Sequence, residues 1–236
     1  DVLLPVSVNF DGFITSHALD VLEVLEDDVV KKFIGNYKPQ EALLDVNAPV
    51  SMGNFDMHDF YFEHKYQQIN AMQQAKRVIA EVGKEFGAIS GREYGIIDSY
   101  KLEDAEMAVV VLNSAAGSAK GVVDMLRARG IKAGVLKPRT FRPFPYEAVQ
   151  EALKGVKAVA VLDRAETFST MGGPMFSEIR TALYDMKNDI KVVNYVYGLG
   201  GRDLRLEDVE KVYNDLGDII KVGKTDDFVR YLGLRG

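Results

Sequence analysis

Residues 108–112 read Ala108-Val109-Val110-Val111-Leu112, a run without a polar side chain that leads into turn-forming residues. A strand that is apolar on both faces is typical of a parallel sheet covered by helices on both sides. Strand-like and helix-like segments then alternate: we expect helices at 117–129, 146–153, 175–186 and 206–216, and strands at 132–136, 156–162 and 190–196. This alternation predicts βαβ units and a three-layer αβα domain, in the α/β class.

The segments on either side of this core are less regular. A short apolar run at 219–222 predicts a fifth strand, and 226–232 a terminal helix. Upstream, the apolar residues of 60–86 recur every three or four positions, which predicts one long amphipathic helix. We expect a buried strand at 1–9, a short helix at 29–34 and an irregular connection at 36–59. Glycines at 87, 91 and 95 mark the expected boundary between domains 1–90 and 96–236.

Composition excludes several classes of protein. The 236 residues fit one large domain or two small ones, and the net charge of −6 disfavours generic nucleic-acid binding. The chain has no Cys, which excludes disulfides, cysteine nucleophiles and any iron–sulfur cluster held by this chain alone. No apolar run reaches the roughly 18 residues of a membrane span, so we expect a cytoplasmic protein without a membrane partner. Because the chain starts at Asp1 on an apolar run, we also expect it to be the C-terminal part of a longer polypeptide.

Two groups of residues suggest ligand chemistry. The small residues of 113–120 follow a strand and open a helix, which fits either an anion site of free backbone N–H groups or a tight turn capped by Ser114 or Ser118. His58 and His64 lie among acidic residues, but their spacing matches no helical ligand pair, and we predict no metal site. His17 follows the Asp11-Gly12 turn, where ligands approach α/β folds.

Two glycine-containing motifs resemble nucleotide sites without matching them. Residues 198–203 read Gly-Leu-Gly-Gly-Arg-Asp, and the dinucleotide fingerprint would need glycine where Asp203 stands. Arg202 and Asp203 could pair within this loop or across an interface. Gly223-Lys224-Thr225 lacks the earlier glycine of a P-loop, so Thr225 is better interpreted as a helix N-cap.

Two segments suit contacts with other domains. Phe141-Arg142-Pro143-Phe144-Pro145 combines a rigid extended backbone with two aromatic rings that flank Arg142. Asp163-Arg164 opens a long loop that runs to Gly172-Gly173-Pro174 and either contacts a neighbour or forms a long turn.

Taken together and in their order along the chain, several of these segments resemble the sequence motifs of one family. The resemblance rests on Asn9-Phe10-Asp11-Gly12-Phe13-Ile14 with Ser16-His17, Tyr61-Phe62-Glu63-His64-Lys65, Gly91-Arg92-Glu93-Tyr94-Gly95, Asp104-Ala105-Glu106, and the motifs at 141–145, 163–174 and 198–203. Together they resemble the α subunit of the thiamine-diphosphate-dependent 2-oxoacid:ferredoxin oxidoreductases, nearest to the pyruvate:ferredoxin oxidoreductases (pyruvate synthases).

The resemblance implies a fold, a reaction and partners. Residues 1–90 would be the end of a thiamine-enzyme pyrimidine-type domain with a long connecting helix, and 96–236 a domain like the C-terminal domain of transketolase. The reaction would be oxidative decarboxylation of a 2-oxoacid, by default pyruvate, to acyl-CoA and CO₂, with CoA and ferredoxin as co-substrates. Thiamine diphosphate with Mg and 4Fe-4S clusters would be held by partners: a thiamine-binding β subunit and ferredoxin-like γ and δ subunits.

The resemblance leaves the catalytic residues unknown. Asp11, Ser16 and His17 are expected near substrate or cofactor, and Arg142, Arg164 and Arg202 at interfaces or loop contacts. Three alternatives stay open from the residues alone. They are a related enzyme that oxidises another small acid such as oxalate, a stand-alone α/β module that binds nucleotides or anions through 113–120, and an interaction module that docks through 141–145.

Overall fold

The computed structural model describes residues 2–13, 15–186 and 189–235. Asp1 and Ile14, which belong to the sequence motifs above, lie outside these ranges. The chain divides into two compact units, and we describe each by itself. The α/β unit comprises residues 1–11 and 71–236, and the 12–70 unit comprises the residues between.

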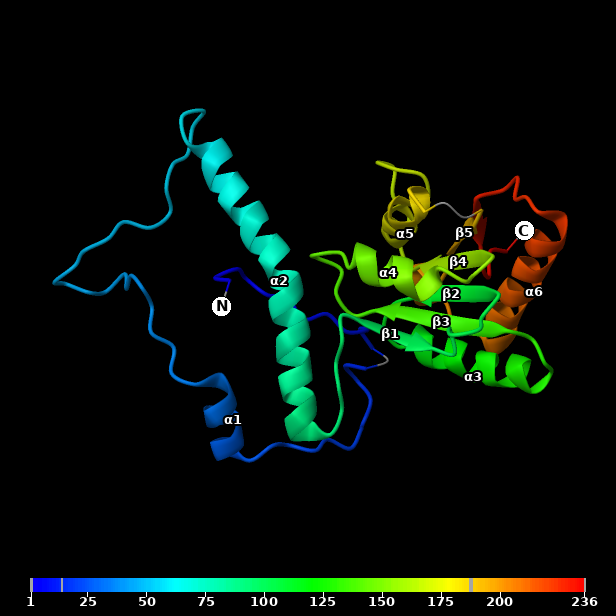
Figure 1. Cartoon of the computed structure of the whole chain (residues 1–236), viewed down its shortest axis with the longest axis horizontal. Coiled ribbons are helices and arrows are strands. Elements are labelled where there is room, and N and C mark those ends of the chain that lie inside the picture. The colour runs from blue at the N-terminus through cyan, green and yellow to red at the C-terminus, as the bar shows by residue number, and fades with distance from the viewer. Residues whose placement is uncertain (1, 14, 187–188, 236) are drawn as a thin grey trace. The chain divides into compact units, whose positions relative to one another are not determined.

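A six-stranded sheet forms the centre of the α/β unit (Figure 1). Its strands are β1 (Ile97–Tyr100), β2 (Met107–Val111), β3 (Ala133–Pro138), β4 (Ala158–Asp163), β5 (Lys191–Val196) and β6 (Val229–Tyr231). The order across the sheet is β1-β3-β2-β4-β5-β6. All neighbours pair in parallel except β1, which runs antiparallel to β3 at one edge.

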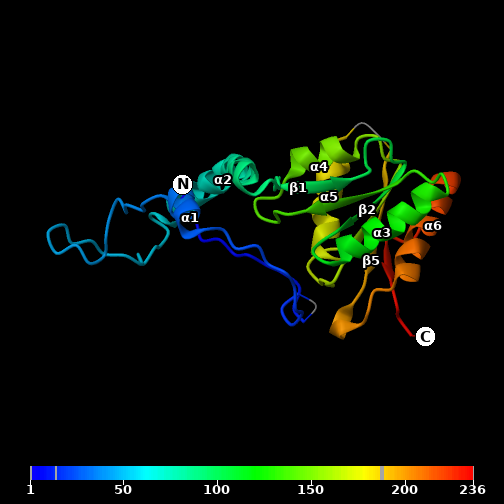
Figure 2. The ribbon, with the colours of Figure 1, turned by 90° about the horizontal axis from the view of Figure 1, so that it is seen from below.

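Helices cover both faces of this sheet (Figure 2). They are α3 (Ala115–Ala128), α4 (Tyr146–Leu153), α5 (Pro174–Tyr184) and α6 (Leu206–Val222), with a short 3-10 turn η1 (Leu199–Gly201) after β5. Helices α3 and α6 pack on one face, and α4 and α5 on the other. The predicted three-layer α/β architecture is therefore confirmed.

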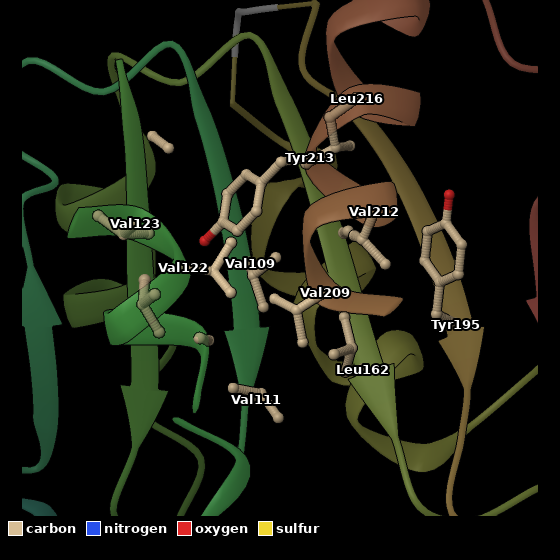
Figure 3. Packing of buried hydrophobic residues seen from close by; sticks show 14 of the residues in the cluster. Val109, Val111, Val122, Val123, Leu162, Tyr195, Val209, Val212, Tyr213 and Leu216 are labelled. Atoms are coloured by element: carbon tan, nitrogen blue, oxygen red, sulfur yellow. The ribbon is translucent and has the colours of Figure 1, made fainter. Parts of the chain in front are cut away.

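The apolar run at 108–112 produces these layers because successive side chains of a strand point to opposite faces. Val109 and Val111 pack beneath α3 and α6, where Figure 3 shows them beside Val122, Val209 and Tyr213. Ala108 and Val110 pack beneath α4 and α5. Both faces are fully buried, as the absence of alternation in the sequence indicates.

The edges of the sheet differ from the sequence predictions. Helix α6 continues through 219–222, where a strand was predicted, and ends at Gly223 with a left-handed φ of 75°. Residues 229–231 form β6 in place of the predicted terminal helix, and 97–100 form the unpredicted β1. No strand forms in the described part of the opening segment, residues 2–9. Strands β1 and β6 are short, so their pairing with β3 and β5 decides their conformation more than local pattern does.

Helix α2 (Tyr61–Ser90) confirms the predicted long amphipathic helix and passes from the 12–70 unit into the α/β unit. Gly87, expected at the domain boundary, lies inside it. The 12–70 unit also contains α1 (Asp27–Ile34) and the predicted irregular connection. None of its described residues is buried, although it carries many large apolar side chains. Among the described residues, no helix is long and apolar enough to span a membrane.

Candidate functional site

The carboxyl ends of β2, β4 and β5 meet at one edge of the sheet because these strands run parallel. In α/β folds this edge is where ligands bind. Asp11 lies here: one carboxylate oxygen accepts a hydrogen bond from the Ser114 backbone N–H at 2.8 Å, and the other lies 3.7 Å from Arg164 Nη1. The structure thus brings Asp11 and Arg164 together with the loop at 113–120.

This contact changes the interpretation of that loop. Neither Ser114 nor Ser118 caps α3 through its side chain. The carboxylate of Asp11, only 11% exposed, takes the Ser114 N–H at the start of the helix instead. A negative charge at this position is stabilised by the helix dipole. The candidate anion site at 113–120 already binds a carboxylate of the chain itself, which disfavours the alternative of a stand-alone module that binds nucleotides here.

Arg164 is held between Asp11 and the ring of Tyr197, whose centroid lies 5.8 Å from the guanidinium carbon. Burial raises the pKa of the Tyr197 hydroxyl to about 12, although the Arg164 charge opposes this. The hydroxyl is therefore protonated at neutral pH. Gly198 makes room for the arginine: it has a φ of 65°, and a Cβ there would lie 2.7 Å from Arg164 Nε.

Asp163 and Asn194 form a buried polar network that the sequence analysis did not identify as part of a site. The Asp163 carboxylate accepts backbone N–H bonds from Met175 at 2.9 Å and Phe176 at 3.0 Å, and a third bond from the Asn194 side chain at 2.9 Å. Asn194 Oδ1 accepts the Gly173 N–H at 2.9 Å. Burial raises the pKa of Asp163, while these donors oppose the shift. The network ties the start of α5 to the end of β4, where Asp163 directly precedes Arg164.

A sequence signal for this network did exist. Asp163 is the last residue of an otherwise apolar strand, and Asn194 interrupts the next one. Polar residues in fully buried strands need partners, so two such residues on consecutive predicted strands could have been paired.

Arg202 lies near the same edge, in the loop after β5. Its guanidinium donates to the carbonyl of Gly233 and, among the described residues, forms no ion pair with Asp203. It lines a cavity of about 410 Å³ together with Asp203, Arg205, Asp208, Gly233, Leu234 and Arg235. Charges of both signs line this cavity, which gives it no clear preference for cations or anions.

Arg142 lies elsewhere, before α4. Its guanidinium donates to Glu178 Oε1 at 2.6 Å and stacks on the Phe141 ring, 4.5 Å from the centroid. The Tyr146 hydroxyl donates to the other oxygen of Glu178 at 2.5 Å. Arg142 thus ties the 141–145 segment to α5, and about half of its side chain stays exposed.

Ser16 and His17 belong to the 12–70 unit. Ser16 Oγ accepts the Phe13 N–H at 2.8 Å and lies 2.7 Å from His17 Nδ1, and the His17 ring stacks on the Phe13 ring. Both side chains are exposed within this unit. Ser16 lies in a turn.

The described residues offer few clustered side chains that could bind a metal ion. No group of three His, Asp or Glu side chains within them could hold a metal ion. His64 pairs with Asp56 at 2.5 Å, and His58 with Asp59 at 3.2 Å. The absence of Cys from the sequence leaves no thiolate for an iron–sulfur cluster. These residues do not fit magnesium or a cluster.

Two family models match the chain. Residues 1–84 match the thiamine-diphosphate-binding domain of pyruvate flavodoxin/ferredoxin oxidoreductases, and residues 105–209 match core domain II of pyruvate:ferredoxin oxidoreductase. The two matches follow one another and together span most of the chain.

Several curated proteins are similar over nearly the whole chain. Pyruvate synthase subunit PorA of Thermotoga maritima is 47% identical over 237 residues, which cover 100% of this chain and 59% of that protein. PorA of Pyrococcus furiosus is 35% identical over 99% of this chain and 59% of its own length. Ketoisovalerate oxidoreductase subunit VorA of Pyrococcus horikoshii is also 35% identical, over 99% and 59%. The chain thus spans about three fifths of the length of these relatives.

Among solved structures, a 2-oxoglutarate:ferredoxin oxidoreductase from Magnetococcus marinus matches 71% of this chain and 24% of that chain, with 14% identity and a TM-score of 0.44. A split-gene transketolase matches 48% of this chain and 39% of that chain, with 21% identity and a TM-score of 0.39.

Proposed function

Because the chain belongs to the family of 2-oxoacid:ferredoxin oxidoreductase α subunits, we propose that it is part of a heteromeric enzyme that oxidatively decarboxylates pyruvate. The products would be acetyl-CoA and CO₂, with electrons passing to ferredoxin. The observation that carries this proposal is the 47% identity to a pyruvate synthase subunit over the full chain. Because the chain spans 59% of that relative, the activity of a whole enzyme is inferred and not observed.

A branched-chain 2-oxoacid is the second candidate substrate. It is favoured by the 35% identity to ketoisovalerate oxidoreductase subunits, which equals the identity to the Pyrococcus furiosus pyruvate synthase subunit. The higher identity to the Thermotoga maritima protein places pyruvate first.

This chain would contribute residues near the substrate or cofactor and contacts with other loops and subunits. We assign residues 1–90 to the end of the first domain and 96–236 to a domain like the C-terminal domain of transketolase, in line with the two matched ranges. Asp11, Ser16 and His17 would lie near substrate or cofactor. Arg142, Arg164 and Arg202 would serve in interfaces or loop contacts. Asp11 and Arg164 neutralise each other at the ligand-binding edge of the sheet, which fixes the loops without adding net charge.

Cofactors and partners follow from the family. Thiamine diphosphate with magnesium supplies the carbon–carbon bond chemistry of such enzymes, and 4Fe-4S clusters carry the electrons. Since the residues of this chain do not fit a metal or a cluster, both would be held by a thiamine-binding β subunit and by γ and δ subunits. CoA and ferredoxin would join as co-substrates, and the complex would act in the cytoplasm.

The test is to purify the native complex that contains this chain and to follow ferredoxin reduction. We expect reduction that requires both CoA and pyruvate, and a purified complex that contains thiamine diphosphate and iron–sulfur clusters. Faster reduction with ketoisovalerate than with pyruvate would select the second substrate. The proposal would be refuted by a complex that contains neither thiamine diphosphate nor iron–sulfur clusters and that does not reduce ferredoxin when any 2-oxoacid is added.

The interface role of Arg142 has its own test in this complex. Arg142→Ala removes the guanidinium that holds 141–145 against Glu178. We expect weaker subunit assembly and an unchanged KM for the 2-oxoacid. Unchanged assembly would show that the segment serves only the fold of this chain.

A further inference from the structure

A second cavity, of about 350 Å³, lies away from the carboxyl edge of the sheet. It lies between the second half of α5, the start of β5 and the loop that joins α6 to β6. The residues that line it are Arg180, Leu183, Tyr184, Ile190, Lys191, Val192, Lys224, Thr225 and Phe228. Its size falls within the range of about 300–1,000 Å³ that is usual for small-molecule sites.

The lining combines three cations with no carboxylate. Arg180, Lys191 and Lys224 all face a cavity that contains no Asp or Glu, in a chain whose net charge is −6. The two lysines pair with Asp189 at 2.5 Å and Asp226 at 2.9 Å. Both partner carboxylates are more than three quarters exposed, so these pairs are weak and an incoming anion can replace them.

Arg180 is the cation that points most directly to a ligand. Its guanidinium stacks on the rings of Phe228 and Phe176, with centroid distances of 5.0 and 5.5 Å. Arg180 is exposed, and within residues 2–13, 15–186 and 189–235 its guanidinium has no carboxylate partner and no hydrogen-bond acceptor from the protein. Phe228 is itself fixed, because its carbonyl accepts the Asn194 N–H at 2.8 Å. The two rings therefore flank a hydrated guanidinium whose donors are available to an incoming anion.

Apolar and aromatic groups complete the cavity. Leu183, Val192 and Phe228 provide apolar surface, and Tyr184 contributes a ring that is 86% exposed. An inorganic anion would use the cations alone, whereas a ligand with both an anionic and an aromatic part would use the whole lining. We propose that this cavity binds a nucleoside phosphate, with its phosphate on Arg180, Lys191 and Lys224 and its base on the Tyr184 and Phe228 side.

Calorimetric titration of the full chain at low ionic strength tests this proposal, with ADP, adenosine and inorganic phosphate as the probes. We expect saturable binding of ADP that is tighter than that of either fragment and weakens as salt is added. Arg180→Gln should weaken ADP binding by about tenfold or more, because charge-assisted hydrogen bonds are lost. The matched control is Arg77→Gln, an exposed arginine of α2 that pairs with Glu81 and should leave binding unchanged.

Three outcomes would overturn the assignment. They are no saturable ADP binding, equal affinity for ADP and inorganic phosphate, and equal loss of binding in the Arg180 and Arg77 variants. Binding of a polyglutamate peptide that Arg180→Gln weakens, together with no binding of ADP, would assign the cavity to an acidic protein partner instead. Circular dichroism of each variant separates a loss of binding from a loss of fold.

Discussion

Asp163 is a buried carboxylate that accepts three hydrogen bonds, two from backbone N–H groups of α5 and one from the Asn194 side chain. Asp163→Asn keeps the shape of the side chain but replaces one acceptor by an NH₂ group. That group would face a donor, so at least one buried hydrogen bond is lost, at a cost of about 1–3 kcal/mol. We expect this loss in urea denaturation followed by circular dichroism.

Asp104→Asn is the matched control for this change. Asp104 pairs with Arg127 at 2.7 Å but is more than half exposed, so the same substitution should leave the unfolding free energy nearly unchanged. Equal effects at the two positions would contradict the role assigned to the buried network.

Asp11 joins the opening segment to the carboxyl edge of the sheet through one backbone N–H and one guanidinium. Asp11→Ala removes both interactions, whereas Asp11→Asn retains an acceptor for the Ser114 N–H. We expect the Ser114 amide hydrogen to exchange roughly tenfold faster in the alanine variant, and less so in the asparagine variant. Hydrogen exchange followed by NMR measures this. Unchanged exchange of this amide in the alanine variant would show that the Asp11 carboxylate does not bind the start of α3.

Helices α2 and α3 each contain a glycine in an interior turn, and the two have opposite surroundings. A Cβ at Gly83 of α2 would lie 1.9 Å from the Tyr94 carbonyl oxygen, so the glycine allows the chain after the helix to pack against it. A Cβ at Gly121 of α3 would meet nothing within 4 Å. We expect Gly83→Ala to destabilise the protein by about 1–3 kcal/mol through the backbone clash.

Gly121→Ala serves as the control and should have the opposite sign. It should stabilise the protein by about 0.5–1 kcal/mol, because alanine restricts the unfolded chain and favours the helix. Thermal unfolding of both variants measures the two changes. A stabilising Gly83→Ala would show that the close approach of Tyr94 is dispensable.

The elements that the sequence predicted correctly are those with strong local patterns. The apolar runs of β2 and β4 and the three-to-four spacing of α2 need no knowledge of neighbours. Strand β6 and the end of α6 could not be predicted this way. β6 has only three residues and is a strand because it pairs with β5, while α6 continues until Gly223 ends it. The contacts of the candidate site could not be predicted from local pattern either, because Asp11 and Ser114 are 103 residues apart in the sequence.

At the scale of the whole molecule, burial of tyrosines links stability to pH. Burial raises the pKa of Tyr197 from 10.0 to about 12, and it also raises those of Tyr195 and Tyr213. In this range the folded state binds more protons than the unfolded state, so stability falls as pH rises. The contribution is fully present below pH 10 and is lost as pH rises through the folded-state pKa. We therefore expect alkaline unfolding to begin above pH 10.

The Tyr197→Phe variant isolates one part of this effect, because phenylalanine has no hydroxyl to ionise. The difference in unfolding free energy between the parent and this variant should shift by roughly 2 kcal/mol between pH 9 and pH 12, in favour of the variant. Urea denaturation at a series of pH values measures it. Tyr37→Phe, at an exposed tyrosine of the 12–70 unit, is the control and should leave the pH profile unchanged. Parallel pH profiles for the parent and Tyr197→Phe would mean that burial does not raise the pKa of the Tyr197 hydroxyl. Another group would then cause the unfolding at high pH.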